Sequence, residues 1–533
     1  MPDVQSVRLL VGDLARWPLR RQRWVWVLPI MMYEVAKREQ TRLQTGIELL
    51  VAVALVILVA RRPGKALAVF IVVLPFSTFI LAALLRLGAP SAAIRGLGFW
   101  KEGIIAGVAV AGLRRMLRTR TRLDRLDKLI VAYLVLGTLY LVLPKLLDGT
   151  LAGAFLSLHV RELGWRSDVM YLGVFLFCRY LGLSRQQVEA LFRRLLVVAV
   201  LVALIGLYEY AAPGSFNHFV VHTIRVPSYE IRVLHVTLKD PTTVLTYSST
   251  GHHVRVGSVL LNYLTVGFYF IFALGIAIEL LSRGQARTWV AMSIPILGTA
   301  LLVVQSRAAI LGGAVTVLLG LRRQIGRSLV QRVRLTVMLS LGLLVFIPVI
   351  VISGLGHRFV GSRGTDNTLH NNSVHLGINI MVKYPLGLGL GTGAGGGQVA
   401  QTEAATSNSS ASIPSVFIPE DQWLQIGTQI GVIGLIIYVA ALVLIVRRLY
   451  PRTHDPGIAD GSVSAGGART ALIGILVGGL FLQPFVEPVV SWTVFALCGL
   501  AAAEMDRLSN GAATRAEHVS TLPDWSASTA PNG

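Results

Sequence analysis

The stretch LIVAYLVLGTLYLVLPKLL, residues 129–147, has a single charged side chain and is long enough to cross the hydrocarbon core of a membrane as a helix. Similar runs recur along the 533-residue chain, which is 54% hydrophobic and only 14% charged and has a mean hydropathy of +0.65. A soluble chain carries about 25% charged residues. The sequence therefore predicts an all-α polytopic membrane protein with about 12–14 transmembrane helices and one large extracytoplasmic loop.

The apolar runs divide the chain into three parts. Residues 1–45 form a basic N-terminal segment, in which WVWVLPIMMYEVA (24–36) is either a short extra span or an interfacial segment. Residues 46–504 are predicted to form the transmembrane bundle with the large outer loop 355–421, and the polar residues 505–533 a disordered cytoplasmic tail. The candidate spans are about 46–60, 66–85, 96–113, 129–147, 168–183, 195–212, 256–281, 289–305, 307–321, 335–354, 422–446, 471–485 and 489–504.

The chain has a formal net charge of +22, and the positions of its basic residues indicate which loops face the cytoplasm. Its arginines cluster in short loops between spans, which is the positive-inside pattern and not a basic surface for a polyanion. We therefore predict no nucleic-acid partner and place loop 114–128, with seven basic residues, in the cytoplasm. Segments 148–167, 213–255 and 355–421 then lie outside. The other strongly basic loops are 61–65, 184–194, 322–334 and 447–452.

The two cysteines, Cys178 and Cys498, lie in separate apolar runs, so neither a disulfide framework nor a cysteine metal site is predicted. The outer segments also contain no His/Cys cluster and no DxD-like acidic triplet. We expect neither a metal nor a cofactor. The apolar run near the N-terminus is not followed by a small-residue cleavage site, so no cleavable signal peptide is predicted.

A glycine-rich tract at 385–397 contains GTGAGG (391–396), which matches G-x-G-x-x-G. The match lacks the preceding strand and the βαβ context that give a dinucleotide motif its meaning. It also falls in the predicted outer loop, where nucleotides are not available. We expect these glycines to let the backbone turn tightly and approach a ligand or another helix closely, or to present N–H groups to an anion.

Segment 371–384 has helical apolar spacing at Val374, Ile378, Met381 and Val382, widened by Leu376 and Ile380. This pattern predicts an amphipathic helix lying on the bundle. His370 and His375 fall near its start. They are either incidental residues of a packed surface helix, or His375 faces a substrate.

Four outward-facing arginines lie at or near predicted span ends: Arg255, Arg307, Arg363 and Arg166. Arg307 is the most informative, because a charge flanked on each side by about 15 apolar residues is costly in lipid and should face a polar cavity or partner. One interpretation is an interfacial anchor whose charge reaches the lipid headgroups. The other is a clamp on phosphate, which the planar guanidinium binds through paired hydrogen bonds.

Acidic candidates are fewer. Glu420 and Asp421 directly precede a long predicted span at its outer end. They either cap that helix, since carboxylates favour its positive end, or one of them is a catalytic base that deprotonates an attacking hydroxyl. Glu487, in QPFVEPVV, is a weaker candidate.

Five motifs occur in the order LYEYAAPG (207–214), RVGSVLLNYLTVGFYF (255–270), SRAAILGG (306–313), KYPLGLGLGTG (383–393) and DQWLQIGTQIGVIGL (421–435). The ordered set resembles O-antigen ligases and related bacterial polysaccharide polymerases over roughly residues 195–505. The resemblance implies an all-helical, metal-independent glycosyltransferase whose donor is a glycan chain on undecaprenyl diphosphate. It also implies that arginines hold the diphosphate at the outer face of the bacterial inner membrane, with Arg255 and Arg307 matching the family's motif arginines.

The motif after the large loop departs from the ligase pattern. Ligases that modify lipid A core have HN-x-x-L there, with the histidine serving acceptor activation, whereas this chain has EDQWL (420–424). An acidic pair resembles the polymerases of capsule or exopolysaccharide biosynthesis in the cell envelope. The implied partners are the lipid-linked oligosaccharide, an acceptor glycan or lipid, membrane lipids and other polysaccharide-assembly proteins.

Two other classes remain open. About 12 spans with sparse charges suit a secondary transporter or a lipid or oligosaccharide flippase, although a transporter should show repeats and broken helices at the bilayer midplane. The second alternative class is a purely structural membrane scaffold, but a scaffold would not need arginines at outer span ends. Convergence of Arg255, Arg307 and Glu420 on one outward site would favour the enzyme.

Overall fold

The computed structural model describes residues 50, 53–142, 156–233, 242–247, 254–282, 288–322, 365–393, 419–450 and 463–520. Six helices within these ranges are long and apolar enough to cross a membrane. They are Pro63–Arg86, Ser91–Arg118, Arg185–Ala211, Tyr263–Ser282, Gln422–Arg448 and Pro488–Ser509. The fold is thus compatible with an all-α membrane protein. The predicted N-terminal segment 1–45, the candidate span 335–354 and Arg363 lie outside the described residues.

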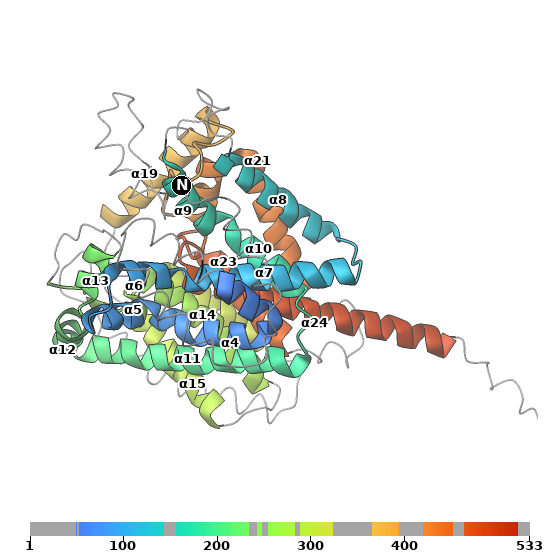
Figure 1. Cartoon of the computed structure of the whole chain (residues 1–533), viewed down its shortest axis with the longest axis horizontal. Coiled ribbons are helices and arrows are strands. Elements are labelled where there is room, and N and C mark those ends of the chain that lie inside the picture. The colour runs from blue at the N-terminus through green and yellow to red at the C-terminus, as the bar shows by residue number, and fades with distance from the viewer. Residues whose placement is uncertain are drawn as a thin grey trace, which may run out of the picture.

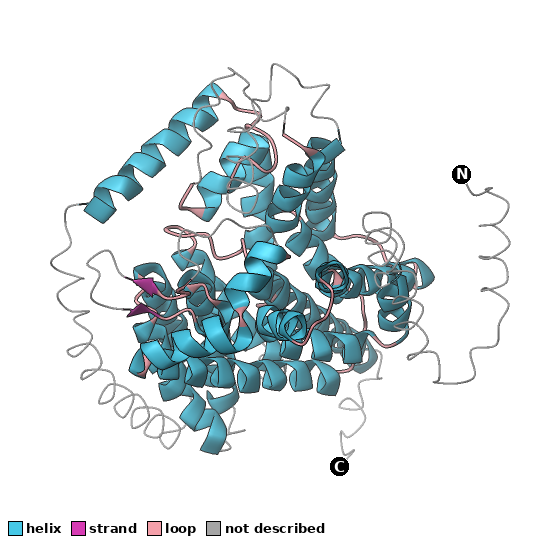
Figure 2. Ribbon diagram, turned by 60° about the vertical axis from the view of Figure 1, so that its left-hand side comes forward, coloured by secondary structure: helices cyan, strands magenta, loops and turns pink. Residues whose placement is uncertain are grey.

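The secondary structure is almost entirely helical (Figure 2). In the first part of the chain the elements are α4 (Pro63–Val73), η2 (Leu74–Phe76), α5 (Ser77–Arg86), α6 (Ser91–Gly98), α7 (Trp100–Arg118), α8 (Arg125–Val142), α9 (Leu158–Asp168), α10 (Met170–Arg179), α11 (Arg185–Ala211), α12 (Pro213–His218), η4 (Phe219–Ile224), α13 (Val226–Arg232) and β1 (Thr246–Tyr247). They are followed by β2 (Val254–Arg255), η5 (Ser258–Leu260), α14 (Tyr263–Ser282), α15 (Thr288–Val303), α16 (Arg307–Arg322), α19 (Thr365–Lys383), α21 (Gln422–Arg448), α23 (Val463–Gly478) and α24 (Pro488–Ser520).

The central helix of the bundle is α14, in which every residue from Thr265 to Ser282 is buried. It packs against α11, α15, α16 and α23, while α10 packs against α24 and α4 against α7 and α11. Helices α4, α7 and α11 run nearly parallel in Figure 1, with α19 and part of α21 above them. A helix that is apolar on all sides belongs in the core of such a bundle.

Small residues bring α23 close to its neighbours. A Cβ atom at Gly312 of α16 would lie 2.5 Å from the carbonyl oxygen of Gly474, and one at Gly275 of α14 would lie 3.0 Å from that of Gly467. Small residues permit this close backbone approach between membrane helices. Because the packing depends on small rather than strongly apolar side chains, hydropathy placed the span wrongly: we predicted 471–485, whereas α23 is Val463–Gly478 and residues 479–487 form a turn.

The start of α14 also differs from the prediction. Residues 254–262 are not part of a span: β2 pairs with β1 in a two-residue antiparallel bridge, drawn in magenta in Figure 2, and η5 follows. Asn262 Oδ1 accepts hydrogen bonds from the backbone N–H groups of Leu264 (3.0 Å) and Thr265 (3.4 Å), which satisfies two free donors at the start of the helix. This local cap places the beginning of α14 at Tyr263 instead of residue 256.

Ion pairs around the buried Arg179 join four elements at one end of the bundle. The Arg179 guanidinium of α10 bonds to carboxylates of Asp124 (2.7 Å), Asp127 (2.6 Å) and Asp506 (2.7 Å), and Arg448 at the end of α21 also pairs with Asp506. We expected the polar tail to begin at residue 505, but helix α24 continues past this position. Its residue Asp506 belongs to the ion-pair network. Buried charges require such paired geometry.

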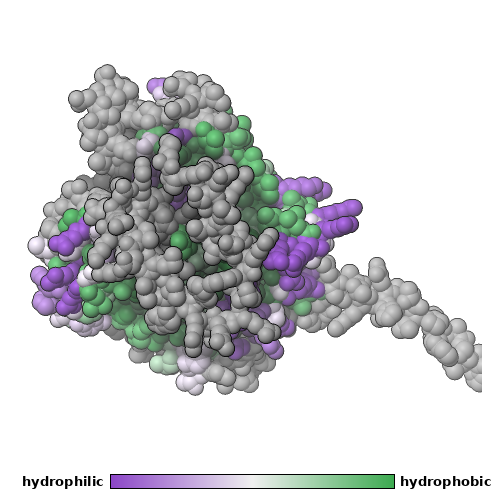
Figure 3. Space-filling model, in the orientation of Figure 1, coloured by the Kyte–Doolittle hydropathy of each residue, from purple (hydrophilic) through white to green (hydrophobic). Residues whose placement is uncertain are grey.

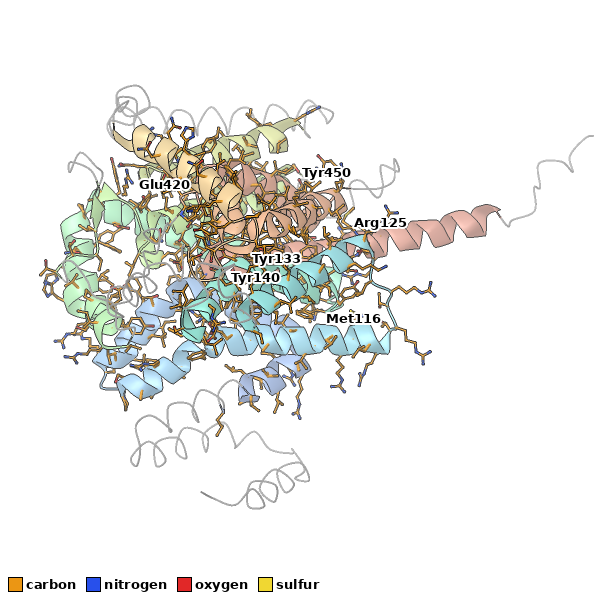
Figure 4. All side chains as sticks on the ribbon, turned by 90° about the horizontal axis from the view of Figure 1, so that it is seen from above. Met116, Arg125, Tyr133, Tyr140, Glu420 and Tyr450 are labelled. Atoms are coloured by element: carbon orange, nitrogen blue, oxygen red, sulfur yellow. The ribbon has the colours of Figure 1, made fainter. Side chains whose placement is uncertain are left out.

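Polar residues gather at two ends of the described surface. Figure 3 shows hydrophilic residues in purple at the left-hand and right-hand edges, with hydrophobic residues in green between them. Figure 4 places Arg125, Met116 and Tyr450 toward one end of the molecule and Glu420 toward the other. Apolar residues on the surface of the long apolar helices are compatible with a membrane protein.

Candidate active site

Asp421 directly precedes the first turn of α21. Its backbone is extended (φ −100°, ψ 140°), and its side chain makes no capping hydrogen bond to the helix. The residue is fully buried, and neither carboxylate oxygen has a hydrogen-bond partner among the described residues. Helix capping therefore does not account for Asp421, although a capping aspartate was one of the two sequence-based interpretations.

His370 of α19 lies against the acidic pair. Its Nδ1 is 3.0 Å from Glu420 Oε2, and its Nε2 is 3.9 Å from Asp421 Oδ1. The Glu420 side chain is 46% exposed and that of Asp421 only 1%. The two neighbouring carboxylates thus have different environments, with one imidazole between them. The structure does not bring His375, the histidine that we had selected, to this pair; it lies exposed further along α19.

The environment of Asp421 changes its acidity. Burial raises the pKa of Asp421 to about 6, while the nearby His370 lowers it and the charge of Glu420 raises it. A carboxyl group with such a pKa is mostly ionised at neutral pH and is more basic than a solvated aspartate. This is a suitable range for a general base.

Arg255 and Arg307 are carried by two adjacent segments. Arg255 Nη1 donates a hydrogen bond to Tyr263 Oη (2.9 Å), and the guanidinium lies 4.9 Å from the centre of the same ring. The side chain of Gln305 donates from Nε2 to the carbonyl of Val254 (3.3 Å), joining the turn before α16 to β2. Arg307 is the first residue of α16 and is exposed. The structure therefore brings together the two motifs that carry these arginines.

The same end of the bundle holds the acidic pair. A Cβ atom at Gly478, the last residue of α23, would lie 2.9 Å from the carbonyl oxygen of Ala308 in the first turn of α16. The neighbouring Gly479 carbonyl accepts a hydrogen bond from the Gln422 backbone N–H (3.3 Å). The beginnings of α16 and α21 thus both lie against the end of α23. This arrangement brings the arginine motifs and Asp421 to one region of the molecule.

Arg166, one of the four arginines predicted to hold phosphate, lies beside an acidic side chain. It forms an ion pair with Glu102 in the first turn of α7, so its charge is compensated within the protein. Glu487, the weaker acidic candidate, lies in the turn before α24. Burial raises the pKa of Glu487, and the positive charges of Lys101 and Arg166 lower it. These four residues form a charge-balanced group and not a cationic site.

Helix α21 is interrupted at Gly431, whose φ of 80° and ψ of 178° are not helical. At the interruption, backbone N–H and carbonyl groups of α21 have no partner within the helix and form hydrogen bonds with the glycine-rich tract. Leu388 N–H donates to the Thr428 carbonyl (2.7 Å), and Val432 N–H donates to the Pro385 carbonyl (2.9 Å). The broken helix is therefore completed by a separate segment of the chain, which satisfies groups that would otherwise be unpaired.

Glycine is required for this contact. Gly387 has a φ of 86°, and a Cβ atom there would lie 2.5 Å from the Gln429 carbonyl oxygen. Gly389 and Gly391 also have positive φ, a region that glycine adopts without steric cost. The prediction that these glycines permit tight turns and close approach to another helix is confirmed. Residues 394–397 lie outside the described part of the chain.

A buried polar network that sequence analysis missed holds the first half of α21. Asp168, fully buried at the end of α9, accepts hydrogen bonds from the side-chain amides of Gln425 and Gln429, the latter at 2.7 Å. Gln429 Oε1 in turn accepts from the Gly391 N–H (2.8 Å). The glutamines at 422, 425 and 429 share one helix face, which was a usable signal.

Glu209 is a second residue that the sequence analysis overlooked. It is buried near the end of α11, and its carboxylate accepts hydrogen bonds from the N–H groups of Gly257 (3.3 Å) and Ser258 (2.6 Å). These contacts fix the turn directly after Arg255. A buried carboxylate directly after an apolar run is a usable signal for such a contact.

Within the described residues, no group of three or more His, Cys, Asp or Glu side chains has a geometry that could hold a metal ion. The candidate site consists of Asp421, Glu420 and His370 with Arg255 and Arg307 nearby. A scan against protein-family models gives no match to this chain, and a search of curated proteins finds no significant relative.

Proposed function

We propose that the chain is a multi-pass glycosyltransferase of the bacterial inner membrane. Its donor is a glycan chain on undecaprenyl diphosphate, and its reaction at the outer face extends a polysaccharide. The observation that carries this proposal is the position of a buried, unpartnered carboxylate, Asp421, at the same end of the bundle as the Arg255 and Arg307 motifs. The family resemblance of the ordered motifs supports the choice of donor.

In the proposed reaction, Asp421 accepts the proton of an acceptor sugar hydroxyl as its oxygen attacks the anomeric carbon of the donor. The new C–O bond forms while the bond from that carbon to the diphosphate breaks, and undecaprenyl diphosphate leaves with the electron pair. Arg255 and Arg307 stabilise its developing negative charge through bidentate hydrogen bonds. A positioned base contributes about 10²–10⁴ in rate.

His370 and Glu420 adjust the base. The imidazole of His370 lies 3.0 Å from Glu420 and 3.9 Å from Asp421, and it lowers the pKa of Asp421, which favours the ionised carboxylate. His370 lies between Asp421 and the exposed Glu420, so a proton that Asp421 takes up can pass to solvent on the side of His370 after each turnover.

Polymerisation is favoured over ligation to lipid A core because the EDQWL sequence replaces HN-x-x-L. His370 nevertheless supplies an imidazole beside the same helix end from another part of the chain. The acceptor therefore has to be identified by experiment: a polymerase extends a lipid-linked or free glycan, whereas a ligase attaches the chain to a lipid.

The runner-up function is a secondary transporter or flippase, and the break at Gly431 is the observation that favours it, because transporters bind substrates at broken helices. Here the break is filled by the backbone of 385–389, and the unpartnered carboxylate lies at the helix end. That distribution supports chemistry at the outer end over transport through the centre.

The test is deletion of the gene followed by complementation with wild type, Asp421→Asn or Glu420→Gln. We expect Asp421→Asn to lose surface polymer while lipid-linked donor accumulates in a form accessible from outside the inner membrane. A flippase defect would instead leave the lipid-linked glycan on the cytoplasmic side. Normal polymer length and amount with Asp421→Asn would refute the proposed role of this residue.

A further inference from the structure

Among the described residues, several buried polar atoms at the start of α21 have no hydrogen-bond partner. Besides both oxygens of Asp421, these are Nε2 of Gln422 and Oε1 of Gln425, and all three residues are at most 4% exposed. An unpaired buried polar atom is destabilising, because it has lost its hydrogen bonds to water without gaining others. Several such atoms on a single helical turn require an explanation beyond packing.

Each glutamine uses one end of its amide group as an anchor. Gln422 Oε1 accepts a hydrogen bond from Phe485 N–H (3.2 Å), and Gln425 Nε2 donates to the carboxylate of Asp168. The remaining atoms, a donor on Gln422 and an acceptor on Gln425, are therefore held in fixed orientations. Preorganised polar groups of this kind favour ligand recognition, because little entropy is lost when the ligand binds.

A further unpartnered donor lies on α9. Trp165 Nε1 is buried and has no hydrogen-bond partner among the described residues. Trp165 is three positions before Asp168 and so shares its helix face, which contacts Gln425. The unpartnered set thus includes donors from Gln422 and Trp165 and acceptors from Asp421 and Gln425.

The chemistry of this set does not suit a diphosphate. A diphosphate requires cations, whereas the set contains one carboxylate and three neutral groups, and the nearby Arg166 is already paired with Glu102. A sugar hydroxyl acts as donor and acceptor at once and can satisfy both kinds of atom.

We propose that the first turn of α21 and the last turn of α9 form a subsite for neutral sugar hydroxyls, occupied by the acceptor glycan. The inference rests on the proposed function in one respect, that Asp421 is the base which the acceptor must reach. Gln422, Gln425 and Trp165 orient the acceptor ring, and the diphosphate of the donor binds at the separate arginine motifs.

The decisive variant is Gln422→Glu. It keeps the oxygen that accepts from Phe485 N–H and replaces the unpartnered donor with an acceptor. Gln187→Glu is the matched control: Gln187 Oε1 also accepts a backbone hydrogen bond, from Ser184 N–H (2.9 Å), but at the start of α11, where Arg185 pairs with Glu504. Trp165→Phe is a second variant, which retains the aromatic packing and removes only the indole donor.

The experiment measures binding to the purified full chain in detergent with two probes. One is a set of neutral oligosaccharides from partial hydrolysis of the host's surface polysaccharide, and the other is undecaprenyl diphosphate. We expect Gln422→Glu to weaken oligosaccharide binding by about 10-fold or more and Trp165→Phe to weaken it in the same direction. Binding of undecaprenyl diphosphate should stay unchanged in both variants, because it uses the separate arginine motifs, and Gln187→Glu should behave as wild type.

The subsite is refuted if wild type fails to bind the oligosaccharides, or if both Gln422→Glu and Trp165→Phe bind them as wild type does. The proposed function has a separate outcome. If undecaprenyl diphosphate does not bind wild type, or Arg307→Ala leaves its binding unchanged, the donor assignment fails, whatever the oligosaccharide result.

Discussion

At the scale of single residues, Glu420 and Asp421 illustrate how environment separates two adjacent carboxylates. Glu420 is half-exposed and bonded to His370, whereas Asp421 is buried, and its oxygens have no hydrogen-bond partner in the part of the chain that the structure describes. We expect Asp421→Asn to reduce turnover by about 10²-fold or more and Glu420→Gln to have a mild effect. Polymer yield and accumulated lipid-linked donor in complemented deletion cells measure both. If both variants have equal and mild effects, neither residue is the catalytic base.

The pKa of Asp421 predicts how the reaction depends on pH. Burial raises this pKa to about 6, and a general base is active only when deprotonated. The initial rate with a purified donor should therefore rise with pH through about 6 and level off above it. Below that value the carboxyl is protonated and cannot accept the hydroxyl proton. A rate that stays constant between pH 5 and 8 would contradict the assignment.

Arg307 tests the phosphate clamp. Lysine keeps the positive charge but has no planar fork, so Arg307→Lys should weaken donor use markedly while the protein still folds. Arg307→Ala should be at least as damaging, and Arg255→Ala similar. The measurement is the KM for lipid-linked donor together with the melting temperature. Arg322→Lys, at the other end of α16, is a matched control and should leave the KM unchanged.

At the scale of elements, α21 shows what a sequence pattern can and cannot predict. The apolar run at 422–446 predicted the helix, and the structure has it at Gln422–Arg448. The interruption at Gly431 was not predictable, because a glycine inside an apolar run is also compatible with an unbroken helix. The break is stabilised by hydrogen bonds from 385–389, a segment distant in sequence.

The amphipathic helix predicted at 371–384, before the glycine-rich tract, was predicted only in part. Helix α19 exists, but the expected apolar stripe is not uniformly buried: Ile380 and Met381 are, whereas Leu376, Ile378 and Val382 are exposed. Periodicity identifies the helix and its apolar residues, but it does not indicate how much of the apolar face the rest of the chain covers.

The break itself is testable by Gly431→Ala. Alanine is strained at a φ of 80°, and its Cβ would lie 2.4 Å from the Pro385 carbonyl oxygen. We expect a loss of about 1–3 kcal/mol in stability, seen as a lower melting temperature of the detergent-solubilised protein. Gly98→Ala is the control, since a Cβ there has no neighbour within 4 Å. Similar melting temperatures for both variants would show that the docked tract is not required.

At the scale of the whole molecule, hydropathy predicted the helical class and all six helices that are long and apolar enough to cross a membrane, because long apolar runs are set by local composition. The helices found at the predicted spans 129–147, 168–183, 289–305 and 307–321 are not among these six. The site was predictable only in outline. Arg255, Arg307 and Asp421 were identified by their places in motifs, but their supports were not, because Asp168 and Glu209 contact residues far away in the chain. Such contacts follow from tertiary packing, which one sequence does not reveal.

The residues that lie at each end of the bundle indicate which parts of the chain face each side of the membrane. Basic residues around 114–128 lie at the end that holds Arg179 and Asp506, whereas Glu420 lies at the opposite end (Figure 4). If the basic loop is anchored in the cytoplasm, the candidate site faces outward, where lipid-linked donors are used. Exposed positions at each end, Thr121 and Asn372, are suitable for cysteine labelling.

In this labelling experiment, Asn372→Cys should react with a membrane-impermeant maleimide in intact cells, once the outer membrane is permeable to it. Thr121→Cys should react only after the inner membrane is opened. The native Cys178 and Cys498 are buried, so the unmodified chain supplies the background. Labelling of both positions from outside would overturn the topology. Labelling of Thr121→Cys alone would place the candidate site in the cytoplasm, away from the proposed donor, and the glycosyltransferase proposal would fail with it.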